Sequence, residues 1–81
     1  MEEGGRERVR VYRIDPATFI TDRKAILEEL VIEADMYDEE INALFREVGA
    51  EPWADDPAIL DAVINRVAAR LGIIVQYEFP Q

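Results

Sequence analysis

The sequence predicts an α+β fold in which two antiparallel strands, one near each end of the chain, pack against two helices in the order β-α-α-β. Three observations predict it: alternating polarity near both ends, helical spacing of apolar residues over the central half, and a capped helix between Asp56 and Gly72. If each element reverses the direction of the chain, the two terminal strands run antiparallel in one small sheet.

The length fits one small domain, because 81 residues leave no room for a second core. An apolar share of 49% is typical of a globular chain. We therefore expect a flexible tail over residues 1–6 and a single small α+β domain over residues 7–81.

The first strand is predicted where charged residues alternate with β-branched ones, from Glu7 to Ile14. This alternation places Val9 and Val11 on one face and Arg8 and Arg10 on the other.

The first helix is predicted from apolar residues that recur at steps of three or four. Thr21 or Asp22 supplies its N-cap, and Gly49 followed by Pro52 ends it. The pattern favours one long helix, kinked near residues 35–38, where Asp35 and Asp38 are both good N-cap residues that also favour a break. The apolar positions are 26, 30, 34, 37, 41, 44 and 48.

The second helix has a clear beginning and end, since Asp56 provides an N-cap, Pro57 suits the first helical position and Gly72 suits the end. The alternation of apolar and polar residues over 73–79 then predicts the second strand, which Pro80 ends.

Charge is unevenly distributed along the chain. Nine basic and eighteen acidic residues give a net charge of −9, yet the segment from Glu28 to Asp61 holds twelve acidic residues against Arg46 alone. Such a field repels nucleic-acid phosphates and attracts basic protein surfaces. A solvated face that only keeps the chain soluble is the competing interpretation.

Most catalytic chemistry is excluded by composition. The chain has no Cys and no His, so thiol nucleophiles, imidazole bases and ordinary zinc sites are absent. Glu29 and Glu33 are neighbours on a helix, but no other ligand type joins them. We expect a non-catalytic protein with no cofactor and no metal.

The predicted binding site lies on the long helix, where Ile32 and Met36 fall outside the apolar stripe and among carboxylates. An apolar spot rimmed by acidic residues is typical of a surface that binds a basic partner. A break near Asp35 is the alternative, and it turns Met36 inward. The predicted partner-binding residues are Glu29, Ile32, Glu33, Met36, Glu39 and Glu40.

We therefore expect an acidic regulator or inhibitor that docks its helix onto a basic surface of a larger protein. One form of this hypothesis is that the acidic helix imitates the charge of nucleic acid. A small accessory subunit of an enzyme complex is one alternative. A dimeric, antitoxin-like transcriptional regulator that contacts DNA through Arg8, Arg10 and Arg13 is the other. The competing interpretation of the DNA-binding alternative is that these arginines pair within the molecule, with the acidic helix or with Glu78.

Two strands alone are marginally stable, so we expect a homodimer formed through a strand edge. No apolar run approaches the roughly 18 residues that span a bilayer, and the first residues do not form a signal peptide. A cytoplasmic protein that binds no membrane is the expectation.

Overall fold

The computed structural model describes residues 8–80 and confirms the α+β class, although the predicted number of helices and strand orientation are wrong. The chain forms two strands and three helices. In order these are β1 (Arg8–Arg13), α1 (Phe19–Glu33), α2 (Asp38–Glu47), α3 (Pro57–Arg70) and β2 (Ile73–Glu78).

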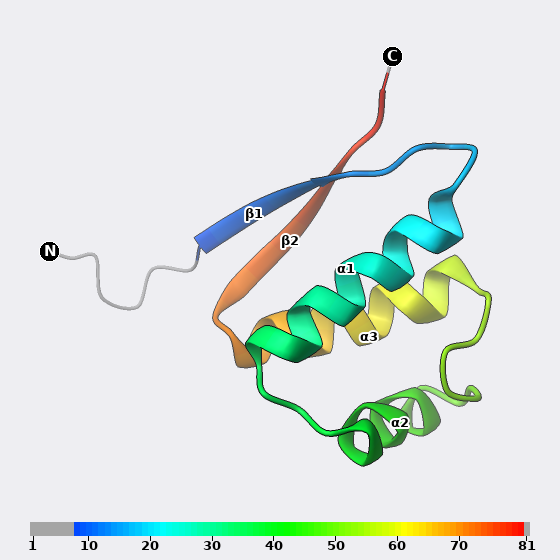
Figure 1. Ribbon diagram of the computed structural model, residues 1–81, viewed down its shortest axis with the longest axis vertical. Coiled ribbons are helices and arrows are strands. Elements are labelled where there is room, and N and C mark those ends of the chain that lie inside the picture. Colours follow the sequence, from blue (N-terminus) through cyan, green and yellow to red (C-terminus); the bar gives the residue numbers. More distant parts are fainter. Residues whose placement is uncertain (1–7, 81) are drawn as a thin grey trace, which may run out of the picture.

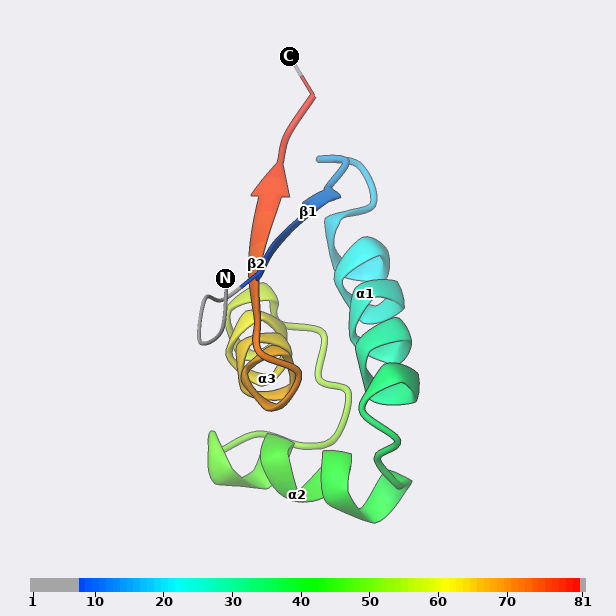
Figure 2. The same cartoon turned by 90° about the vertical axis from the view of Figure 1, so that its left-hand side faces the viewer.

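The two strands pair in parallel, not antiparallel, with Arg8 opposite Ile73 and Arg13 opposite Glu78. Figure 1 shows that α1 and α3 run in the same general direction, back against the strands, and Figure 2 shows that α2 crosses at the end of the molecule away from the strands. α2 thus returns the chain to the start of α3, so β2 begins at the same end of the sheet as β1. In the expected fold the second helix follows the first directly and runs antiparallel to it, which gives antiparallel strands. The parallel orientation of β2 is therefore a consequence of the additional helix.

The additional helix arises because the predicted long helix is broken over residues 34–37. Asp35 adopts a left-handed conformation, with φ of 55°. The N–H of Met36 then donates to the carbonyl of Val31 at 3.1 Å, which turns the chain out of the helix. The break brings Met36 into the core, which also contains Ile41 and Phe45 of α2. Burial of this side chain explains why the break is favoured over a continuous helix.

The signals that predicted α3 are confirmed. The Asp56 carboxylate accepts a hydrogen bond from the Ala58 N–H at 2.9 Å, and Pro57 occupies the first turn. Gly72 lies just beyond the helix with φ of 70°, a conformation that favours glycine. Gly72 thus lets the chain turn directly from α3 into β2.

The core lies between the sheet and helices α1 and α3, and α2 closes it at the end away from the strands (Figure 2). Fully buried residues such as Leu27, Leu30 and Val63 form its centre. Trp53 packs on this core through Phe45, with 5.6 Å between ring centroids. Trp53, which lies in the connection between α2 and α3, thus covers part of the core.

The two faces of β1 differ in chemistry, as the alternation predicted. Arg10, Tyr12 and Ile14 are partly or fully buried and lie on the helix side, whereas Val9 and Val11 are exposed. The inner face is therefore the one that bears Arg10 and Tyr12, whereas Arg13 shares the outer face with Val9 and Val11. Among the described residues, no helix combines the length and apolar character that a membrane crossing requires.

Candidate protein-interaction surface

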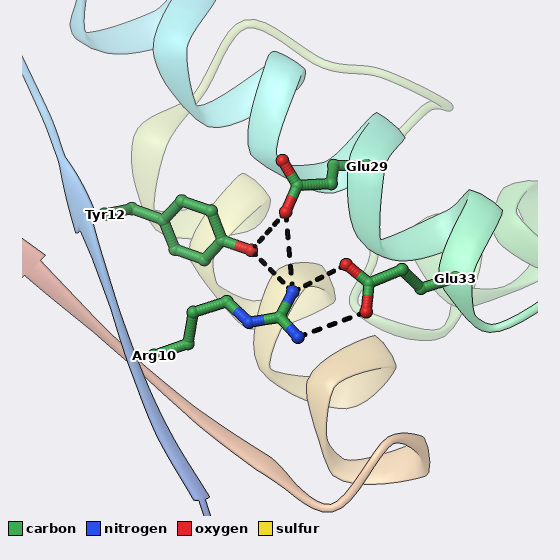
Figure 3. A network of polar contacts seen from close by, with 4 residues as sticks. All are labelled: Arg10, Tyr12, Glu29 and Glu33. Carbon is green, nitrogen blue, oxygen red and sulfur yellow. Dashed lines mark hydrogen bonds and ion pairs between the residues drawn. The ribbon is translucent and has the colours of Figure 1, made fainter.

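A polar network joins β1 to α1 on the inner side of the sheet (Figure 3). The Arg10 guanidinium donates to both carboxylate oxygens of Glu33, at 2.6 and 3.1 Å, and reaches Glu29 at 3.4 Å. The Tyr12 hydroxyl donates to Glu29 at 2.7 Å. Glu29 and Glu33 lie one helical turn apart, so one arginine contacts both.

This network changes the electrostatics of its members. The hydrogen bond from Arg10 holds the pKa of Glu33 below its usual range. Partial burial raises the pKa of Tyr12, and its hydrogen bond to Glu29 acts in the same direction. Near neutral pH the network therefore contains a carboxylate bound to a guanidinium and a phenol that keeps its proton, and it ties strand to helix.

The structure separates the six residues predicted to bind a partner. Glu29 and Glu33 are engaged by Arg10, and Met36 is buried at 9% exposure, as the alternative with a break anticipated. The carboxylate of Glu40 accepts the N–H of Tyr37 at 2.9 Å and lies 3.8 Å from Arg70.

Ile32 and Glu39, the remaining two, stay exposed. A second exposed apolar residue, which the sequence analysis missed, lies close to them in the chain. Ile32 is 78% exposed and Tyr37 is 73% exposed, the highest values among the large hydrophobic residues of the described chain. The apolar spacing placed Tyr37 in the buried stripe of the helix. Asp35 and Asp38, which lie close to it in sequence and favour a break, were the signal that Tyr37 is not part of that stripe.

The exposed residues at the junction of α1 and α2 form one surface, which we call the α1–α2 corner. Glu28, Asp35, Asp38 and Glu39 carry exposed carboxylates near Ile32 and Tyr37 in sequence. Unlike Glu29, Glu33 and Glu40, these four form no ion pair with another residue of the described range 8–80. The corner comprises Glu28, Ile32, Asp35, Tyr37, Asp38 and Glu39.

The arginines proposed for DNA contact are also separated. Arg10 is engaged by the carboxylates of α1, whereas Arg8 and Arg13 are exposed. The intramolecular pairing considered against DNA contact is thus formed by Arg10. The pairing partner is the acidic helix and not Glu78.

A second polar cluster lies deeper and connects three elements. Arg23 of α1 is only 8% exposed and donates to Asp61 of α3 at 2.8 Å, while Tyr77 of β2 donates to the same oxygen at 2.6 Å. The guanidinium carbon of Arg23 lies 4.9 Å from the centre of the Tyr77 ring. Burial, followed by the bond to Asp61, raises the pKa of Tyr77. The cluster holds α1, α3 and β2 together.

Within residues 8–80 no pocket is detected, and no three Asp or Glu side chains gather as a metal site requires. Comparison with protein-family models, with curated proteins and with solved structures found no match to this chain. Among the features described, the α1–α2 corner has the chemistry most typical of an interaction surface.

Proposed function

We propose that this protein is a non-catalytic binding module, a regulator or inhibitor, that docks the α1–α2 corner onto a basic surface of a larger protein. The observation that carries the proposal is the exposure of Ile32 and Tyr37 among carboxylates that form no ion pair within residues 8–80. Apolar anchors surrounded by charge are typical of binding surfaces, because the anchors supply affinity and the charges supply orientation.

The proposed partner is basic because of the charge of this region. Net charge is −9, and the corner contributes four carboxylates that lack an ion-pair partner in the described part of the chain. A basic surface is attracted to such a region, and its association rate rises as salt is lowered. An aromatic or aliphatic pocket on the partner would receive Ile32 and Tyr37.

The proposal is tested by capture of proteins from the native host with three forms of the chain. These are the unchanged protein, the corner variant with Ile32→Ser and Tyr37→Ser, and a control with Val9→Ser and Val11→Ser. The control removes two exposed apolar side chains from the outer face of β1, which is not part of the corner. We expect the unchanged protein and the control to capture a basic protein that the corner variant does not capture.

The purified partner then gives the quantitative result. We expect the corner variant to bind about tenfold more weakly or worse, as loss of anchors does at other interfaces. Glu28→Lys is expected to slow association more than Glu51→Lys, which makes the same charge change in the α2–α3 connection. Equal binding by the corner variant and the unchanged protein contradicts the proposal.

A further inference from the structure

The outer face of the sheet is a second exposed surface, distinct from the α1–α2 corner. Helices α1 and α3 lie on one side of the two strands, and the other side is uncovered within residues 8–80 (Figures 1 and 2). On this uncovered face Val9 is 54% exposed, Val11 55% and Ile74 40%. An apolar face of this kind is typical of an interface.

The register of the strands sets the order of side chains on this face. Three pairs lie side by side along it: Val9 with Ile74, then Val11 with Gln76, and finally Arg13 with Glu78. The face is thus apolar at one end, polar in the middle and charged at the other end. The one positive and one negative residue of these pairs leave it neutral in a molecule of net charge −9.

This order is complementary to itself. A two-fold axis parallel to the strands, midway between two stacked sheets, places β1 of one copy over β2 of the other. This rotation leaves the position of each residue along the strand direction unchanged. Residues that are neighbours across β1 and β2 within one sheet therefore also face each other between the two stacked sheets. Arg13 then lies over the partner's Glu78 and Val9 over the partner's Ile74. Every contact occurs twice, as in any two-fold interface.

We propose that two copies of this chain associate through the outer faces of their sheets, with β1 of each copy over β2 of the other. Aligned stacking of two sheets about 10 Å apart is a common arrangement of β-structure. The two molecules repel each other through their net charge, and the neutral outer face is where they approach at least cost.

Stacking fits the fold better than pairing through a strand edge does. Two packed helices occupy about 20 Å, whereas two strands occupy about 10 Å, so the helix layer extends beyond the sheet. A second copy that approached an edge would bring its own helices against α1 or α3 before its strand came within hydrogen-bonding distance. No such layer lies over the outer face of the sheet.

The size of the face predicts a weak dimer. Two strands of six residues cover roughly 20 by 10 Å, well below the roughly 800 Å² per partner of a stable interface. We therefore expect self-association that depends on concentration in the micromolar to millimolar range. The dimer leaves both α1–α2 corners free, since each lies at the end of its copy away from the sheet (Figure 2).

The decisive experiment uses two charge variants, Arg13→Glu and Glu78→Arg, followed by sedimentation equilibrium across a concentration series. Each variant alone places like charges over each other at two symmetric positions, so we expect self-association to weaken about tenfold or more. In an equimolar mixture every Glu faces an Arg, and a one-to-one heterodimer should form at the concentration of the unchanged protein. Arg46→Glu makes the same charge change on α2 and should leave the dimer intact.

A second pair of variants keeps the test independent of charge. Val11→Lys places a charge in the middle of the face and should give a monomer, whereas Ile32→Lys, on α1, should not. Circular dichroism confirms that each variant is folded. Monomeric unchanged protein at millimolar concentration, or a mixture that fails to restore association, overturns the proposal.

Edge pairing gives a different result. In the ladder of β1 and β2, the Arg8 N–H bonds to Gly72 and the Ile14 N–H to Glu78, so Val75 points its N–H at the free edge. A dimer that Val75→Pro abolishes, and that both charge variants leave unchanged, would support the edge and overturn the stacked dimer.

Discussion

The ion pair between Arg23 and Asp61 is the residue-level contact with the most deeply buried charge. Arg23 is 8% exposed and donates to the Asp61 carboxylate, whose side chain is 34% exposed, and to the Phe19 carbonyl. Asp61→Ala leaves this guanidinium without its counter-charge and Tyr77 without its acceptor. We expect a loss of about 2–3 kcal/mol in the free energy of unfolding, measured by urea denaturation.

The control for this prediction is Asp55→Ala. Asp55 also forms an ion pair, with Lys24, but its side chain is 77% exposed. Loss of an exposed pair costs about 0.5 kcal/mol or less. If both variants lose the same stability, burial does not govern the strength of the Arg23 contact.

Glu33 makes stability depend on pH in a defined direction. The bond from Arg10 lowers the pKa of Glu33 in the folded state, so folding favours its ionised form. Its contribution is complete above the pKa of the unfolded chain and is lost as the pH falls through the lower, folded value. We expect Glu33→Gln to destabilise the protein at neutral pH and to have less effect in acid.

This prediction is measured by urea midpoints at neutral and acidic pH for both proteins. Glu51→Gln is the matched control, since Glu51 is exposed and forms no ion pair within the described range. A difference between Glu33→Gln and the unchanged protein that is constant with pH would contradict the assigned role of Arg10.

At the scale of elements, the break between α1 and α2 depends on the backbone of Asp35. Its φ of 55° lies in a region that Asp tolerates better than most residues with a side chain, and that Gly adopts freely. We expect Asp35→Ala to cost about 1 kcal/mol and Asp35→Gly to stay within about 0.5 kcal/mol of the unchanged protein. Thermal and urea unfolding measure both values. An unaffected Ala variant would show that the junction adopts another conformation.

Elements whose signals are local were predicted from the sequence, and the others were not. Asp56 and Gly72 fix the ends of α3 through their own backbone and neighbouring atoms, so α3 was predicted correctly. The apolar spacing continues through residues 34–37 as if the helix did, whereas the structure breaks the helix and buries Met36 in the core. Asp35 and Asp38 gave a local signal for a break, but the burial of Met36 depends on how separate elements pack, which sequence spacing does not reveal.

The same limit applies to the candidate site. Exposure of Ile32 was predicted from its position on a helix, which is a local property. Pairing of the arginines with the acidic helix was considered, but the residues involved were not identified, because Arg10 reaches Glu29 and Glu33 only after β1 packs on α1. The spacing of apolar residues that predicted a continuous helix also placed Tyr37 in the core. The structure breaks the helix at this point and leaves Tyr37 exposed.

At the scale of the whole molecule, the wrong prediction of a continuous helix explains the wrong prediction of antiparallel strands. The break produces the additional helix α2, which returns the chain to the start of α3, so the two strands run parallel. Parallel strands in this register place Arg13 beside Glu78 on the outer face. The antiparallel arrangement expected from the sequence would have placed the two residues at opposite ends. The self-complementary order used in the dimer proposal therefore depends on the break at Asp35.

Self-association also predicts a dependence of thermal stability on protein concentration. A dimer that forms only from folded chains stabilises them by mass action, by about 0.7 kcal/mol per protomer for each tenfold rise above the dissociation constant. For a domain of this size that corresponds to a rise in Tm of about 3–5 °C. Differential scanning calorimetry at several concentrations should show this rise for the unchanged protein and for Arg46→Glu. For Val11→Lys Tm should be constant, and for Arg13→Glu alone the rise should begin at a concentration about tenfold higher or more. A constant Tm in the unchanged protein at millimolar concentration would mean that its folded state is monomeric.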